Sequence, residues 1–122
     1  MAEPFSQNTG VAQGDPLFFV IYLENSMAAY LIVDTQIENP EAYEEYKVLA
    51  RPIAEKYGGV YRARGGDMET LESDLWEPTR MVIIEFPDMD AARAFVNSPE
   101  YEPVKPIRRS NTKCTVAIVD GI

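Results

Sequence analysis

The sequence predicts an α+β domain with the element order β-α-β-β-α-β, in which a four-stranded antiparallel sheet carries both helices on one face. Three observations support this fold class. Four segments alternate between apolar and polar residues, and two others repeat apolar residues at helical spacing, with Gly, Pro, Asn and Asp between them. The chain has 122 residues, of which 46% are hydrophobic, and this is enough for the core of one domain.

The first 26 residues are predicted to be an N-terminal extension to a domain over residues 27–122. Residues 1–16 are rich in Gln, Asn, Gly, Pro and Ser, whereas residues 17–23 are all apolar. This apolar run is too short to span a bilayer, and no basic residue precedes it as in a signal peptide. Two interpretations stay open: a leader before a natural start at Met27, or an extra edge strand over residues 17–23 that extends this sheet or a partner's.

The first strand and first helix have clear signals. Residues 30–37 alternate as a strand does, and Asn39 and Pro40 are residue types that favour the N-cap and first turn of a helix. Apolar side chains then recur at helical spacing over residues 42–57. Gly58-Gly59 supplies the positive φ that ends a helix.

The second half of the chain contains the remaining elements. These are predicted to be a strand over 60–64, a strand over 80–86, a helix over 89–97 and a last strand over 113–119. The second strand is expected to resume over residues 68–72 after Gly65-Gly66. Ser98 starts only one or two irregular turns, because Pro103 and Pro106 interrupt any helix that follows.

Composition narrows the classes of function. The formal net charge of −9 disfavours nucleic acid and anionic membrane surfaces as partners. The sequence has no histidine, which removes the commonest transition-metal ligand and the commonest general base. Its single cysteine, Cys114, rules out an internal disulfide and fits a small buried hydrophobe in a reducing compartment. We therefore expect a cytoplasmic protein without a metal site or cofactor.

Strand alternation predicts which side chains point away from the helices. Leu31, Val33, Val82, Ile84 and Phe86 are expected to face the helices. The opposite face is expected to mix apolar and charged side chains, namely Tyr30, Ile32, Asp34, Arg64, Met81, Ile83 and Glu85. An uncovered apolar face needs burial, and a second copy of the chain is the simplest cover. The pattern therefore predicts a homodimer.

This mixed face resembles the wall of a small-molecule pocket. The predicted ligand-binding residues are Tyr30, Arg64, Met81, Glu85 and Tyr101. Arg64, Glu85 and Asp34 are the catalytic candidates, because a carboxylate can move a proton while a guanidinium stabilises an oxyanion. The alternative is that Arg64 and Glu85 form a structural ion pair at the dimer interface, and that Tyr101 is a packing aromatic after a helix cap.

Five short motifs occur in a characteristic order. They are Asn39-Pro40-Glu41-Ala42-Tyr43, Lys56-Tyr57-Gly58-Gly59, Arg64-Gly65-Gly66, Arg80 to Phe86, and Ser98-Pro99-Glu100-Tyr101. Over residues 30–122 the chain thus resembles the Domain of Unknown Function 1330 family. The resemblance implies the ferredoxin-like dimeric α/β barrel, shared with cofactor-free antibiotic-biosynthesis monooxygenases, haem-binding relatives and muconolactone isomerase. It implies no established activity.

Two classes of function follow from these expectations. The first is an uncharacterised homodimeric protein that binds a small metabolite in the barrel interior. The second is a cofactor-independent oxygenase, isomerase or cyclase that acts on a small aromatic or carbonyl-bearing metabolite, and this rests on fold-level analogy.

Overall fold

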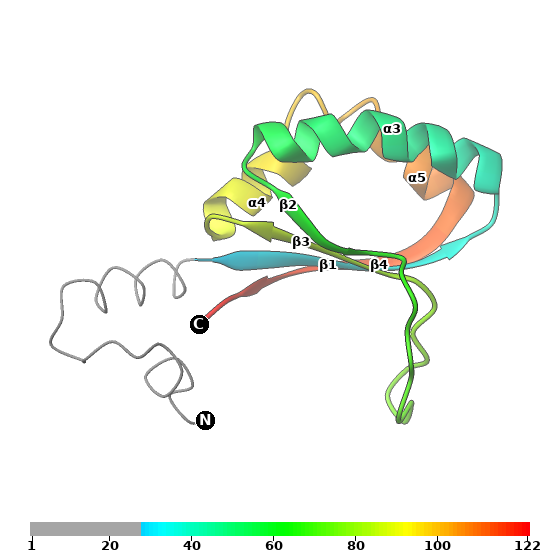
Figure 1. Ribbon diagram of the computed structural model, residues 1–122. Helices are drawn as coiled ribbons and strands as arrows, with labels where there is room; N and C mark the ends of the chain where they lie inside the picture. Colours follow the sequence, from blue (N-terminus) through cyan, green and yellow to red (C-terminus); the bar gives the residue numbers. More distant parts are fainter. Residues whose placement is uncertain (1–27) are drawn as a thin grey trace, which may run out of the picture.

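The computed structural model describes residues 28–122 (Figure 1). Its elements are β1 (Ala29–Ile37), α3 (Pro40–Lys56), β2 (Val60–Arg64), β3 (Met81–Phe86), α4 (Met89–Val96), α5 (Lys105–Asn111) and β4 (Thr112–Asp120). The predicted order of strands and of the first two helices is confirmed. The predicted extension over residues 1–26, with its apolar segment 17–23, lies outside the described residues.

The four strands form one antiparallel sheet in the order β2-β3-β1-β4. Leu31 of β1 pairs with Ile84 of β3 on one side and with Ile118 of β4 on the other. All three helices cover one face of this sheet (Figure 1). The arrangement is the predicted ferredoxin-like α+β fold.

The helix starts follow from local capping. The Asn39 side chain accepts a hydrogen bond from the Ala42 amide at 3.2 Å, which satisfies a free N–H in the first turn of α3. Asp88 does the same for Ala91 in α4 at 2.7 Å. Gly58 follows α3 with a φ of +91°, a conformation that glycine adopts at little cost.

The prediction of irregular turns around Pro103 and Pro106 is wrong in its second half. Turns cover residues 99–104, but Lys105–Asn111 is a helix, α5. Proline in the first turn of a helix loses no hydrogen bond, because the first N–H groups have no partner within the helix. Pro106 therefore starts α5 instead of preventing it.

The predicted second part of β2 is also wrong, because residues 65–80 form a long loop without a strand. Gly65 turns the chain out of β2 with a φ of +72°, and a Cβ atom there would overlap the Arg80 guanidinium. The loop projects beyond the sheet on the side away from the helices (Figure 1). It exposes Leu71 and Leu75, whose side chains are 83% and 88% accessible.

The core lies between the sheet and the helices. The rings of Phe86 and Phe95 stack with their centres 5.6 Å apart, and the ring centres of Phe95 and Tyr101 are 4.6 Å apart. The other members of this cluster are Leu31, Val33, Ala50, Ala54, Val82, Ile84, Ala92 and Val104. The expected helix-facing side chains of β1 and β3 are thus confirmed.

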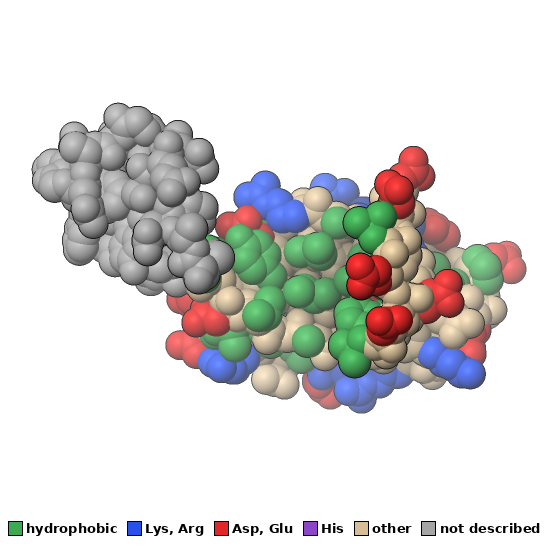
Figure 2. Space-filling view, turned by 90° about the horizontal axis from the view of Figure 1, so that it is seen from below, with side chains coloured by type: hydrophobic (Ala, Val, Ile, Leu, Met, Phe, Trp, Pro, Cys, Tyr) green, Lys and Arg blue, Asp and Glu red, His purple; other side chains and the backbone are tan. Residues whose placement is uncertain are grey.

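The opposite face of the sheet carries no helix within residues 28–122, and we call it the bare face (Figure 1). Hydrophobic side chains gather across it in Figure 2. Tyr30 pairs there with Glu85 and Val119, and Ile32 pairs with Ile83 and Ala117. In addition, no helix among the described residues is long and apolar enough to cross a membrane.

Candidate functional site

A small cavity lies on the helix-covered face, between the sheet and α3, and we call it the tyrosine pocket. The cavity has a volume of about 50 Å³, which is room for a few water molecules. Its polar or charged lining residues are Tyr43, Tyr46, Lys47, Tyr61, Arg64, Tyr101 and Arg108. Its apolar wall is Leu31, Val33, Ala50, Val82, Ile84, Phe95, Val96 and Val116.

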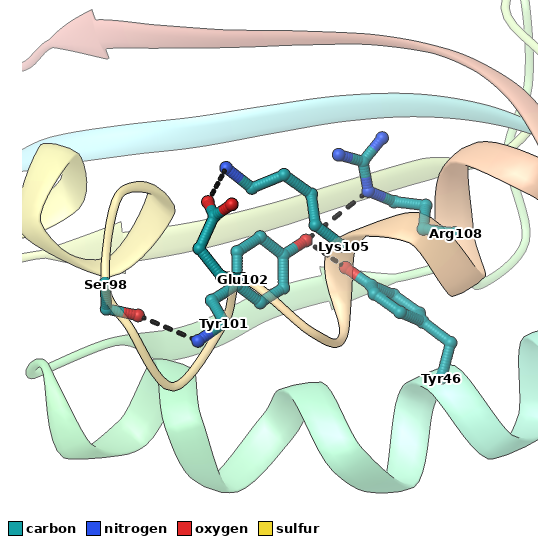
Figure 3. A network of polar contacts seen from close by, with 6 residues as sticks. All are labelled: Tyr46, Ser98, Tyr101, Glu102, Lys105 and Arg108. Atoms are coloured by element: carbon teal, nitrogen blue, oxygen red, sulfur yellow. Dashed lines mark hydrogen bonds and ion pairs between the residues drawn. The ribbon is translucent and has the colours of Figure 1, made fainter.

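A buried tyrosine, Tyr101, forms a hydrogen-bonded chain in this pocket with the partly buried Tyr46 and with Arg108 (Figure 3). The hydroxyl groups of Tyr46 and Tyr101 lie 2.6 Å apart, and Arg108 Nε donates to the Tyr101 hydroxyl at 3.4 Å. Burial, together with the neighbouring Tyr101, raises the pKa of Tyr46. The Tyr46 phenol therefore stays protonated at neutral pH and acts as a neutral hydrogen-bonding group.

Arg108 is buried without a carboxylate. Its side chain comes from α5 and is 8% exposed. Its hydrogen-bond partners within residues 28–122 are the Tyr101 hydroxyl and the Cys114 sulfur. A buried guanidinium is ordinarily paired with an acid, so this one has capacity left for an anionic or carbonyl oxygen.

Arg64 lines the same pocket because β2 contains a bulge. The register shifts between Tyr61 and Ala63, so Tyr61 pairs with Ile84 and Arg64 pairs with Val82, both on the helix-covered face. The Arg64 guanidinium lies 5.0 Å from the centre of the Tyr61 ring and donates to the Lys47 carbonyl at 3.5 Å. A cation over an aromatic face is a favourable contact.

The expected pairing of Arg64 with Glu85 is therefore wrong. Strict alternation placed them on one face, but the extra residue of the bulge turns Arg64 to the other side. Arg62 takes its place, with Nε 2.8 Å from Glu85 Oε1 on the bare face. The expectation that Arg64 lies in the interior between two sheets fails for the same reason.

The other predicted site residues divide between the two faces. Tyr101 is 4% exposed and lines the tyrosine pocket with Arg64. Tyr30, Met81 and Glu85 lie half-buried on the bare face, where Tyr30 pairs directly with Glu85, whereas Met81 pairs with Asp34 at the other end of β3. The structure thus brings together two of the five predicted ligand-binding residues in the pocket and leaves three outside it.

Asp34 is engaged in holding the 65–80 loop. Its carboxylate accepts hydrogen bonds from Trp76 Nε1 at 2.8 Å, the Thr79 amide at 2.9 Å, the Thr79 hydroxyl at 2.7 Å and the Arg80 amide at 3.1 Å. Burial by itself raises the pKa of Asp34, but these donors outweigh it and lower the pKa to about 2. A carboxylate in this state is a weak base, so its contacts favour a structural role.

The sequence missed three important pocket residues. Arg108 lies in the helix that was not predicted, so nothing indicated its direction. Tyr43 and Tyr46 belong to the helical repeat over residues 42–57, whose spacing indicated burial but not that the two side chains line a cavity. Arg80 supports the wall from behind, because it donates to the Tyr43 hydroxyl at 2.9 Å.

Neither face offers a metal site among the described residues. No three His, Cys, Asp or Glu side chains in this part of the chain are close enough to hold an ion. The pocket wall itself has phenols, guanidiniums and an ammonium as its polar groups, with no carboxylate among its described members. Its chemistry suits an acceptor-rich ligand rather than a cation.

Comparison with known proteins adds the family and the fold. A family model described as Domain of unknown function (DUF1330) matches residues 28–122. The chain is similar to RPA0582, a protein of unknown function from Rhodopseudomonas palustris, with 15% identity, a TM-score of 0.65, and 88% of this chain and 94% of that one covered. No curated protein matches the sequence.

A second solved structure is similar at the level of the fold. SnoaB, a cofactor-independent oxygenase from Streptomyces nogalater, superimposes with a TM-score of 0.59 at 13% identity, with 79% of this chain and 94% of that one covered. A conserved protein from Methanosarcina mazei Go1 gives a TM-score of 0.51 at 14% identity, with 83% and 99% covered. Similarity at such identities describes a shared fold.

Proposed function

The chain belongs to the DUF1330 family, and from this premise we propose that it is a small homodimeric protein that binds a small aromatic or carbonyl-bearing metabolite in the tyrosine pocket. The observation that carries the proposal is the buried Arg108 guanidinium, which lines an apolar cavity without an acid beside it. The pocket replaces the interior between two sheets as the proposed place of binding.

The lining supports a ligand with an apolar body and oxygen acceptors. Aromatic rings of Tyr43, Tyr46 and Tyr61 offer flat contact surfaces, and their hydroxyls can donate hydrogen bonds. Arg64 and Arg108 add two cationic donors from β2 and α5. Cavities that bind small molecules are typically apolar with a few such converging polar groups.

Binding is favoured over catalysis because the wall lacks a suitable base. The carboxylates expected to move a proton, Asp34 and Glu85, lie on the bare face and are held by Thr79, Trp76 and Arg62. A tyrosine with a raised pKa, such as Tyr46, does not replace them at neutral pH.

A cofactor-independent oxygenase is the second candidate. The likeness to SnoaB supports the fold that it needs, and two guanidiniums in an apolar pocket would stabilise an enolate oxygen. In such a reaction the ligand itself would have to ionise readily. Oxygen consumption by the purified protein in the presence of an ionisable phenol or 1,3-dicarbonyl compound distinguishes conversion from binding.

The proposed dimer is supported by the bare face. Val60 and Val119 are each 47% exposed, and half-buried Tyr30, Ile32 and Ile83 lie between them. A second copy would bury these apolar side chains and leave the tyrosine pocket of each subunit on the outer, helix-covered side. Symmetric pairing of identical faces is the commonest form of oligomer.

Native mass spectrometry of the full chain tests both parts of this proposal. Arg64 and Arg62 are two positions apart on β2 and serve opposite faces, so Arg64→Met and Arg62→Met are matched variants. We expect a dimer with a co-purified small mass for the wild type and for Arg62→Met, and an empty dimer for Arg64→Met. A ligand retained by Arg64→Met but lost by Arg62→Met would move the site to the bare face, and a monomer would refute the dimer.

A further inference from the structure

A second, wider cavity opens beside the tyrosine pocket, and we call it the α5 cleft. It lies between α5, the end of α4 and the helix-covered side of β4, with a volume of about 520 Å³. The cleft and the pocket share four lining residues, namely Leu31, Val96, Arg108 and Val116. The α5 cleft therefore adjoins the tyrosine pocket.

The cleft concentrates positive charge in an acidic protein. Lys105, Arg108 and Arg109 all line it, and they follow one another at i, i+3 and i+4 along α5, so they lie on one side of that helix. Its other described lining residues include no Asp or Glu. With a net charge of −9 for the whole chain, such a local patch of opposite sign is a focus for anions.

These cations are not all neutralised by neighbours. Lys105 pairs with Glu102 at 3.1 Å, as Figure 3 shows. Within residues 28–122, the ion pairs include neither Arg108 nor Arg109. Arg108 is buried between pocket and cleft, whereas Arg109 is exposed. Two guanidiniums in one cleft are thus free to bind an oxyanion, for which their planar donors are well suited.

We infer that the α5 cleft is an anion-binding subsite, and that the ligand of this protein is an aromatic or apolar molecule that bears a carboxylate or phosphate group. The inference rests on the proposed function, because the apolar body of the ligand extends from the tyrosine pocket, which at about 50 Å³ holds only a small group, into the wider cleft. Arg108 lines both cavities and would contact the ligand where its body joins its anionic group. Lys105 and Arg109 complete the cleft around that group.

The test compares charged and neutral probes of one shape. Benzoate, phenyl phosphate and benzamide are titrated separately into the ¹⁵N-labelled full chain, and dissociation constants are taken from amide shifts of α5 and β4. Arg109→Gln removes one exposed cation from the cleft. Arg93→Gln is the matched control, since Arg93 is also exposed but belongs to α4 and pairs with Asp90 at 3.0 Å.

We expect both anions to bind the wild type at least about fivefold more tightly than benzamide, since a partly exposed charge contact contributes about 1 kcal/mol. Arg109→Gln should reduce anion affinity about three- to tenfold and leave benzamide binding unchanged. Arg93→Gln should change neither by more than about twofold. The stronger of the two anions identifies the group as carboxylate or phosphate.

The outcomes separate the subsite from the pocket. Equal affinity for benzoate and benzamide, with shifts in the pocket, would overturn the anion subsite while the proposed function stands. Anion binding that is equally weakened by Arg109→Gln and Arg93→Gln would reveal a general charge effect and also overturn it. Absence of shifts in both cavities with all three probes would refute the pocket and the subsite together.

Discussion

The two faces of the sheet differ in how their apolar and charged side chains are buried and paired. On the helix-covered face, Phe86 and Ile84 pack against α3 and α4, and polar groups meet in a cavity lined by tyrosine and arginine. On the bare face, apolar side chains stay half exposed and the charged groups have partners: Glu85 pairs with Arg62, and Asp34 accepts hydrogen bonds from Trp76 and Thr79. The comparison teaches that unpaired charge marks the candidate site here, whereas exposed apolar surface marks the proposed subunit contact.

The sharpest test of this contrast is a truncation on each face. Phe86 is 1% exposed, so Phe86→Ala should lower the free energy of unfolding by about 3–5 kcal/mol through lost burial and a cavity. Urea unfolding measures this. Met81→Ala, at the other end of β3 and on the bare face, is the control, and its loss should be smaller and dependent on protein concentration. Equal losses independent of concentration would show that the two faces are packed alike.

A charge placed in the middle of the bare face tests the proposed dimer. Ile83→Asp puts a carboxylate opposite Ile32, and burying it between two sheets would cost several kcal/mol unless the copies separate. We expect a folded monomer by sedimentation velocity, with an unchanged circular dichroism spectrum. Ile83→Val is the conservative control and should stay dimeric. A dimer that survives Ile83→Asp would place the contact elsewhere.

Asp34 holds the 65–80 loop on the bare side by hydrogen bonds to its carboxylate, and this predicts that the stability of the protein depends on pH. Because its pKa in the folded state is lowered to about 2, ionised Asp34 stabilises the protein above its unfolded pKa of about 4. That stability is lost as pH falls from about 4 through about 2.

Asp34→Asn should therefore cost about 1–2 kcal/mol at pH 7, since hydrogen bonds to a charged acceptor are lost. The difference in the free energy of unfolding between this variant and the wild type should shrink as pH falls toward 2. Urea unfolding at several pH values across that range measures it. Asp90→Asn, which alters an exposed acid of α4, is the control. A constant difference between pH 7 and pH 2.5 would contradict the predicted role of the charge.

The smallest effect is expected from a single hydroxyl in the tyrosine pocket. Tyr46→Phe removes the 2.6 Å hydrogen bond to Tyr101 and should cost about 0.5–1.5 kcal/mol. Tyr101→Phe breaks the same hydrogen bond and also removes the Tyr101 hydroxyl from Arg108. Because the bond between the two tyrosines can be lost only once, the double variant should cost less than the sum of the two single losses. Strict additivity in this double-mutant cycle would mean that the two hydroxyls do not interact.

Much of the fold could be predicted because its signals are local. Alternation in β1 and β3 correctly assigned Leu31 and Val82 to the helices, and the cap at Asn39 marked the start of α3. Part of the candidate site could not be predicted, because its residues are placed by pairing and packing between segments and not by local signals. Arg64 changed faces through a bulge that depends on pairing with β3, and Arg108 entered the pocket on a short helix that its own proline-containing sequence did not suggest.

The order of elements, the helix starts and the apolar character of both sheet faces follow from local sequence, since periodicity and capping act within a few neighbouring residues. Local sequence does not specify that Arg62 is the arginine that pairs with Glu85, or that Tyr46, Tyr101 and Arg108 line one cavity; the folded chain does. The Tyr46–Tyr101 hydrogen bond, for example, joins residues 55 positions apart. Such contacts are set by register shifts and helix placement, which depend on how whole strands and helices pack.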